Sequence, residues 1–364
     1  MNRLAHLRLT TIWYAVSALI AAAALLVGVF AFAPATELTI YTWEDYIAPE
    51  VVASFEETYH VEVSIHEFES EFDLVRAYRE QPDLDAYDLI FFSDTVAEEL
   101  RRLGVLSSIK KNQVPNIEYI APTLLDTRVN AEGLHAVPYM FGTTGIVYNE
   151  KYVDADTVDW SSFWDEQYRG KSCLLNDESE VIAAAALSQG FDAVPTNDAA
   201  MREVTALVRQ YTENDGTYCG DVGQTEELVQ ERLWITQNWN GSAIPALDEN
   251  PSLAYIIPGD GGRLWYDMMA IPRGAKHART ATLFINFINE PRVAAENVMY
   301  LQYASVNDAA REYIDPEILQ NEIIYPSSST RARVHASADF PYYEAVADMR
   351  DEINEIMQEG KFIE

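Results

Sequence analysis

Histidine and cysteine are scarce in this chain, and they follow no metal-binding pattern. Among 364 residues there are six histidines and two cysteines. The histidines lack the HExxH spacing, and two cysteines cannot complete a structural zinc site alone. The sequence also contains no GxSxG, Walker or GxGxxG motif. We therefore expect no metal, no cofactor and no catalytic residues.

Basic residues are also in short supply. The chain has 25 lysines and arginines against 58 acids, which gives a formal net charge of −33. Such a surface repels nucleic acid and anionic membranes, so neither is expected as a partner. The charge would favour a cationic ligand, although solubility or salty surroundings account for the larger part of it.

The N-terminus lacks charge over a long run. Arg3 and Arg8 precede an uncharged, largely apolar stretch from Ile12 to Ala35. This pattern predicts a signal peptide or a membrane anchor over residues 1–35, with the rest of the chain on the outer side of the membrane. The run ends in small residues that suit cleavage, yet it is nearly long enough to span a bilayer, so cleavage and permanent anchoring both stay open. We expect a periplasmic or extracytoplasmic protein, tethered if the segment is retained.

The two cysteines are Cys173 and Cys219. An oxidising compartment allows such a pair to form a disulfide. Both lie in short strand-like runs in the same half of the chain, which favours a bridge over the alternative of two buried free thiols.

Strand and helix periodicities alternate along the chain. The expected strands are residues 37–43, 61–68, 87–92, 171–177, 217–221, 234–241, 253–258 and 263–272. The expected helices are residues 48–60, 71–80, 94–104 (capped by Asp94), 179–191, 198–212, 225–233 and 279–300. This alternation predicts an α/β fold with mostly parallel sheets, and the roughly 330 residues after the apolar segment suffice for two lobes.

Rings and acids gather where strands are expected to end. Trp43, Asp45 and Tyr46 follow the first strand, while Asp177 and Trp239 lie at the ends of later ones. Ligands of open α/β sheets bind beyond the carboxyl ends of the strands. We therefore expect a binding site there. Paired carboxylates and tryptophans would also suit a glycosidase, which is the main enzymatic alternative.

Six segments occur in an informative order. They are YTWEDYIAPEVVASFEE (41–57), YDLIFFS (87–93), VPYMFGTTGIVYN (137–149), WNGSA (239–243), WYDMMAIP (265–272) and FINFINEPRVAA (284–295). Together they resemble the spermidine/putrescine-binding proteins, the extracytoplasmic receptors of polyamine ABC importers, over nearly all of residues 37–364. The resemblance implies a two-lobed type II periplasmic-binding-protein fold with the ligand between the lobes. Lobe 1 would comprise residues 36–144 and 267–311, and lobe 2 residues 145–266 and 312–364.

The resemblance also implies a set of ligand-binding residues. They are Trp43, Glu44, Asp45, Tyr46, Ser93, Asp177, Glu180, Trp239, Trp265, Asp267 and Tyr303. A polyamine is a chain of methylenes between ammonium groups, so carboxylates would pair its charges while ring faces cover its linker. The implied function is that of a monomeric, non-enzymatic receptor, which delivers a polyamine to an ABC permease.

Plainer roles compete with some of these assignments. Asp177 and Glu180 stand where acids favour the start of a helix without any ligand. The rings of Trp239, Trp265 and Tyr303 could instead belong to a hydrophobic core. Asp267 interrupts an apolar strand, and because a buried unpaired acid is costly, a functional role is favoured there.

Three positions depart from the family pattern. Thr95 stands where the spermidine binder has a tyrosine, and Glu44 stands where threonine or serine is common. Asp45 resembles the acid of putrescine binders. These departures leave the preferred amine open, with a receptor for another organic cation, or a sensor that signals without transport, as alternatives.

Overall fold

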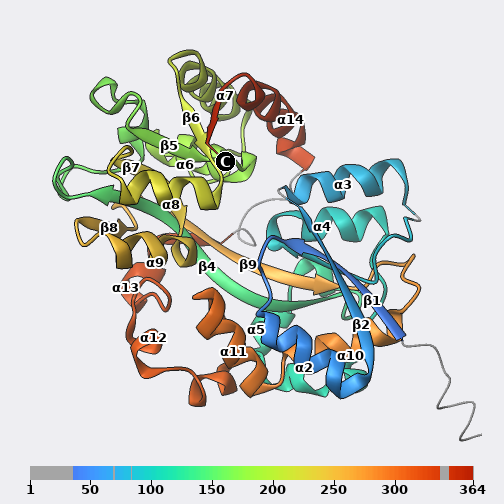
Figure 1. The fold of residues 1–364 in the computed structure, drawn as a ribbon. Coiled ribbons are helices and arrows are strands. Elements are labelled where there is room, and N and C mark those ends of the chain that lie inside the picture. Colours follow the sequence, from blue (N-terminus) through green and yellow to red (C-terminus); the bar gives the residue numbers. More distant parts are fainter. Residues whose placement is uncertain (1–35, 69, 83, 337–343, 364) are drawn as a thin grey trace, which may run out of the picture.

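Two long strands, β4 (Ala136–Asn149) and β9 (Gly262–Ala270), pass through the middle of the molecule. The computed structural model describes residues 36–363 apart from 69, 83 and 337–343, so the predicted export or anchor segment lies outside it. The strand order is β12-β6-β5-β7-β4-β9-β3-β1-β2. One lobe lies at each end of the β4–β9 pair (Figure 1), which confirms the prediction of a two-lobed α/β fold.

The lobe that begins the described chain is built on a parallel ladder. β1 (Thr36–Trp43) pairs in parallel with β2 (Val61–Phe68) and with β3 (Leu89–Ser93). Its helices include α2 (Pro49–Tyr59), α3 (Glu71–Glu80), α4 (Asp94–Leu103), α5 (Pro122–Leu125), α10 (Ala278–Ile288) and α11 (Pro291–Leu301). α2 buries Val51 and Phe55, one helical turn apart, as the sequence pattern predicts for a βαβ unit.

The other lobe repeats this plan with different elements. Its parallel strands are β5 (Ser172–Leu175), β6 (Thr217–Cys219), β7 (Ile235–Trp239) and β12 (Lys361–Ile363). Its helices include α6 (Glu178–Ser188), α7 (Asp198–Glu213), α8 (Asp221–Val229), α9 (Asn240–Glu249) and α14 (Glu344–Gln358). α6 is buried from Glu178 to Leu187, so its first turn stands inside the molecule.

The remaining elements are short. They are β8 (Leu253–Ile256), β10 (Ala304–Ser305), β11 (Val334–Ala336), α12 (Pro316–Gln320), α13 (Ser328–Arg331) and the 3-10 helices η1 (Lys111–Gln113), η2 (Pro115–Tyr119), η3 (Arg128–Asn130), η4 (Trp160–Trp164), η5 (Glu166–Tyr168) and η6 (Asp308–Glu312). Among the described residues, no helix combines the length and the apolar character that crossing a bilayer requires.

The predicted long helix over residues 279–300 is wrong. The chain instead forms α10 and α11, with a break at Asn289 and Glu290. Pro291 has no backbone N–H and disfavours helical backbone in the residue before it. The carboxylate of Glu290 then caps α11 by accepting hydrogen bonds from the N–H groups of Arg292 (3.0 Å) and Val293 (3.1 Å).

Other boundaries also differ from the sequence prediction. Asp94 does not cap α4; the hydroxyl of Ser93 does so by accepting a hydrogen bond from the N–H of Thr95 (3.2 Å). Helix α8 begins at Asp221 rather than at residue 225. The ladders β1–β2–β3 and β5–β6–β7–β12 are parallel, as predicted, but β4 and β9, which join the lobes, pair antiparallel with each other and with β7 and β3, respectively.

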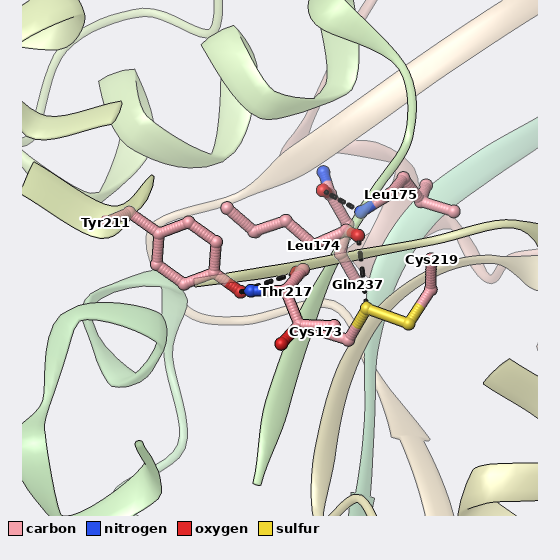
Figure 2. The surroundings of a disulfide bond; sticks show 7 residues. All are labelled: Cys173, Leu174, Leu175, Tyr211, Thr217, Cys219 and Gln237. Atoms are coloured by element: carbon pink, nitrogen blue, oxygen red, sulfur yellow. Dashed lines mark hydrogen bonds between the residues drawn. A yellow bond between two sulfur atoms is a disulfide. The ribbon is translucent and has the colours of Figure 1, made fainter. Parts of the chain in front are cut away.

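A disulfide joins Cys173 in β5 to Cys219 in β6, with Cα atoms 6.1 Å apart (Figure 2). Beside it, the side chain of Gln237 in β7 accepts a hydrogen bond from the N–H of Leu175 (3.2 Å). The same side chain donates to the backbone carbonyl of Glu180 (2.8 Å). The ends of β5, β6 and β7 are therefore tied together at the point where α6 begins.

Candidate functional site

Three buried side chains lie in a row on β9, a strand that joins the lobes. Arg263, Trp265 and Asp267 are each two residues apart, and side chains of a strand alternate between its faces, so the three point the same way. Their exposed fractions are 6%, 6% and 5%. The row therefore places a guanidinium, an indole and a carboxylate in the interior at the junction of the lobes.

Glycine on the neighbouring strand makes room for this row. Gly142 of β4 pairs with Trp265 of β9. A Cβ atom at position 142 would stand 2.3 Å from Cζ2 of Trp265 and 2.4 Å from Oδ1 of Asn240. The indole can therefore pack against the backbone of β4 only because position 142 has no side chain.

Asp267 is covered by Tyr46, whose hydroxyl donates a hydrogen bond to its carboxylate. Burial raises the pKa of Asp267 well above its usual range, and the negative charges of Glu71 and Asp94 add to this effect, while the Tyr46 bond opposes it. Tyr46 is itself held by a hydrogen bond from the Tyr139 hydroxyl to its backbone carbonyl (3.3 Å). A positive charge brought next to Asp267 would therefore stabilise its ionised form.

Four predicted aromatic residues form a continuous wall beside Asp267. The ring centroids of Trp43 and Tyr46 are 5.1 Å apart. The ring centroids of Tyr46 and Tyr303 are 6.0 Å apart. The ring of Tyr303 in turn lies 5.2 Å from that of Trp265. Such faces attract cationic nitrogens and cover apolar linkers. The structure brings together rings that lie up to 260 positions apart in the chain.

Glu180 is the acid at the other end of the β9 row. One of its carboxylate oxygens, Oε1, contacts Arg263 Nη1 (2.9 Å) and accepts hydrogen bonds from the hydroxyl of Thr144 (3.0 Å) and the indole N–H of Trp239 (3.2 Å). The other oxygen is buried and has no hydrogen-bond partner in the described part of the chain. Burial raises the pKa of Glu180, and the charge of Arg263 opposes that shift.

Asp177 caps the helix on which Glu180 lies. Its carboxylate accepts a hydrogen bond from the N–H of Glu180 (2.9 Å). Asp177 therefore does cap the helix, which was the plainer role considered for it in the sequence analysis. The carboxylate of Glu180, in contrast, contacts Thr144, Trp239 and Arg263. Burial raises the pKa of Asp177, and Arg263 opposes this shift.

Ser93 is buried and bonded to an acid that sequence reasoning missed. Glu71, the first residue of α3, accepts hydrogen bonds from the N–H (2.6 Å) and the hydroxyl (2.7 Å) of Ser93. Burial raises the pKa of Glu71 to about 7. Glu71 follows the end of β2. Because ligands of α/β sheets bind beyond the carboxyl ends of strands, the same rule that indicated the other acids could have indicated Glu71.

Arg263 is the second residue that sequence reasoning missed. It lies near the start of β9, next to Glu180, and no feature of the sequence distinguishes it from a surface arginine. Its burial follows only from the path of β9 between the lobes.

Glu44 and Asp45 lie apart from the converging set. Both are exposed, in the turn after β1. The carboxylate of Asp45 accepts a hydrogen bond from the exposed hydroxyl of Tyr300 on α11 (2.6 Å). The structure therefore gathers nine of the predicted residues at or near the junction, while these two acids face the solvent.

The acids of the site do not form a metal centre. Among the described residues, no group of three or more histidine, cysteine or acidic side chains has the arrangement that holds a metal ion. The site instead combines buried carboxylates with aromatic rings. That combination suits an organic cation with an apolar body.

A separate surface hollow in the second lobe does not share this character. It is lined by residues of η4, η5 and α7, including Trp164 and Tyr211. The indole N–H of Trp164 donates to the carbonyl of Leu207 (3.0 Å), and the hydroxyl of Tyr211 donates to that of Thr217 (2.8 Å). These polar groups already have partners within the fold, so the residues around β9 are the stronger candidate.

Comparison with known proteins gives one family and several relatives. The model of the bacterial extracellular solute-binding protein family matches residues 50–325. The spermidine/putrescine-binding periplasmic protein of Salmonella typhimurium is 27% identical over 315 residues, covering 86% of this chain and 90% of that protein. The putrescine-binding periplasmic protein PotF of Escherichia coli is 28% identical over 339 residues, covering 87% and 91%.

A solved structure agrees with these relatives. The spermidine/putrescine ABC transporter substrate-binding protein PotD of Streptococcus pneumoniae superimposes with a TM-score of 0.71 at 25% identity. The match covers 89% of this chain and 99% of that one. The likeness therefore extends over both lobes.

Proposed function

The chain belongs to the bacterial extracellular solute-binding proteins, and from this premise we propose that it captures a polyamine between its two lobes and delivers it to an ABC permease. The names of its relatives, which refer to spermidine and putrescine, support an amine as the ligand. We further propose that residues 1–35 direct export and, if retained, tether the receptor to the membrane. In this proposal the lobes keep the predicted division, 36–144 with 267–311 and 145–266 with 312–364.

The observation that carries the proposal is the surroundings of Asp267. This carboxylate is buried beneath Tyr46 and lies on the same strand face as Trp265. A buried carboxylate without a countercharge is destabilising, so the site gains most from a ligand that brings a positive charge. The adjacent rings would cover the methylene linker of that ligand.

A second acid supports a ligand with more than one ammonium group. Oε2 of Glu180 is buried without a hydrogen-bond partner among the described residues. Leaving such an atom unsatisfied costs about 1–3 kcal/mol or more, because its bonds to water are lost on folding. An ammonium group at this oxygen would recover that energy, which supports a ligand charged at both ends.

We propose binding without catalysis. Members of the family bind solutes, and the two acids at the start of α6 are engaged, Asp177 with a backbone N–H and Glu180 with Arg263. Both lie on one helix, whereas a glycosidase needs carboxylates on opposite sides of the scissile bond. This arrangement supports a receptor over the glycosidase alternative.

Isothermal titration calorimetry of the purified protein tests the proposal. Putrescine, cadaverine, spermidine and spermine are titrated separately, with choline as a quaternary amine and a neutral disaccharide as a control. We expect saturable heat with at least one polyamine and none with the disaccharide. Heat with choline alone would replace the polyamine with another cation, and heat with none of the amines would refute the proposal.

A further inference from the structure

An arginine lies inside the acidic site. The guanidinium of Arg263 contacts Glu180 Oε1 through Nη1 (2.9 Å) and donates a hydrogen bond to the hydroxyl of Thr95 through Nη2 (2.9 Å). Thr95 belongs to α4 of the first lobe and Glu180 to α6 of the second. Arg263 is 6% exposed, so this cation is a fixed interior part of the junction between the lobes.

The charge of Arg263 is stabilised by acids on several elements. Burial works against the charged form, but Glu180, Asp177, Asp94 and Glu71 outweigh it and raise the pKa of Arg263 above its ordinary value. These acids include residues that the ligand would otherwise neutralise. Part of the negative charge of the site is therefore balanced by the protein itself.

The position of Arg263 relative to Asp267 sets a length scale. They are four positions apart in one strand, which corresponds to about 13 Å between their Cα atoms, and Trp265 lies midway between them. A ligand with one ammonium at Asp267 and its linker across the indole of Trp265 would have its far end near Arg263. A second ammonium at that end can pair with the unpartnered Oε2 of Glu180, whereas any further positive group would meet the guanidinium of Arg263 without a carboxylate of its own.

Among the described residues, the two ends of this row each offer a carboxylate position to a ligand. One is Asp267, and the other is the unpartnered Oε2 of Glu180, whose Oε1 already contacts Arg263. Two ammonium groups can use these positions, and a third would have to replace Arg263.

Building on the polyamine function proposed above, we infer that Arg263 is a specificity-determining residue, an internal cation that makes this receptor select diamines over triamines and tetraamines. The mechanism combines occupation of one countercharge position with repulsion of any further ammonium group. Like-charge contacts at a desolvated interface are strongly unfavourable and are a common source of selectivity.

The test compares putrescine with spermidine by calorimetry on the wild type and three variants. The wild type is expected to bind putrescine at least about tenfold more tightly than spermidine, given the cost of placing like charges together. In Arg263→Met the preference should shift toward spermidine by about tenfold or more, because Glu180 then lacks its countercharge. Arg263→Lys keeps an internal cation and should keep the diamine preference. The double variant Arg263→Met with Glu180→Gln should lose the gain in spermidine affinity.

The outcomes separate this inference from the proposed function. If the folded wild type binds neither of these two amines and also fails to bind cadaverine and spermine, the polyamine function fails and this inference falls with it. If the wild type binds spermidine as tightly as putrescine, or if a folded Arg263→Met variant keeps the wild-type preference, the role of Arg263 is refuted while the polyamine function stands. The wild-type measurement decides the matter even if Arg263→Met does not fold, which its circular dichroism spectrum will report.

Discussion

The hydroxyl of Tyr46 donates a hydrogen bond to Asp267, although 221 positions separate the two residues in the chain. Tyr46 follows the first strand of one lobe, and Asp267 lies in a strand that joins the lobes. Burial is the main cause of the raised pKa of both side chains. The pair therefore joins an aromatic wall to a carboxylate whose neutral form is favoured until a cation approaches.

Replacing Asp267 with asparagine removes the charge and largely keeps the shape. We expect the affinity for the best polyamine to fall by a factor of roughly 30 or more, since loss of one partner of a buried charge pair costs about 2–5 kcal/mol. Calorimetry measures the change. The matched control is Asp248→Asn, because Asp248 is an exposed acid on α9. Equal affinities for the two variants would remove Asp267 from the site.

Ligand binding is expected to release protons. The pKa of Glu71 is raised to about 7, and that of Asp267 is raised well above its usual range, in both cases mainly by burial. An ammonium group stabilises the ionised carboxylates, so binding lowers both pKa values and expels protons. The affinity should therefore rise as the pH increases from about 6 to 8, while the amine stays charged.

Calorimetry in two buffers with different ionisation enthalpies counts these protons. Glu71→Gln is the informative variant, because the amide can still pair with Ser93 but cannot titrate. It should release fewer protons than the wild type near pH 7. A wild type that takes up protons on binding would contradict this account of the site.

Glu71 also makes the stability of the ligand-free protein depend on pH. Its folded-state pKa of about 7 lies above the ordinary 4.5, so the folded state binds more protons between these values. The free energy of unfolding should therefore fall as the pH rises from about 4.5 to 7, by at most on the order of 3 kcal/mol from this one residue. Denaturant titrations at pH 5 and pH 7.5 measure it. The variant Glu71→Gln should gain stability relative to the wild type at the higher pH, and a constant difference would argue against the raised pKa.

Much of this architecture follows from the spacing of apolar residues and from the residues that begin and end helices. The helix at residues 71–80 and the strands around it are set by apolar spacing that only one secondary structure accommodates. The break at Pro291 escaped prediction because apolar residues continue in helical spacing on both sides of it. The serine cap of α4 escaped because Ser93 and Asp94 are both good caps, and the backbone geometry decides between them.

Placement near the junction of the lobes could be predicted where family motifs and strand ends coincide, as at Trp43 and Trp239. Glu71 and Arg263 depend instead on tertiary placement. A buried arginine has no local signature, because its burial is decided by which strand crosses the junction and by which acids surround it. The orientation of Asp45 likewise depends on Tyr300, a residue of a distant helix.

The disulfide should contribute substantially to stability. It closes a loop with a sequence separation of 46 residues, for which the chain-entropy estimate is about 4 kcal/mol. Replacing both Cys173 and Cys219 with alanine should therefore lower the midpoint of thermal unfolding by roughly 6 °C. A reductant should lower the midpoint of the wild type similarly and leave the double variant unaffected. If the reductant shifts both proteins equally, the bridge is not the cause.

Gly142 should be required for binding because it lies beneath Trp265. In Gly142→Ala the new methyl group would stand 2.3 Å from the indole and 2.4 Å from the amide oxygen of Asn240, so one or both must move. We expect the free energy of unfolding to fall by about 1–3 kcal/mol, as is typical of overpacking. Displacing the indole should also weaken polyamine binding by about tenfold, because the ring faces no longer align with the carboxylates.

The matched control for Gly142→Ala is Gly259→Ala. A Cβ atom at position 259 would meet no other atom within 4 Å. This variant therefore has the same chemical change without the steric conflict, and it should match the wild type in polyamine affinity. If both alanine variants bind equally well, Trp265 does not form part of the ligand wall, because a ring forced away from β4 could not keep its contacts with the ligand.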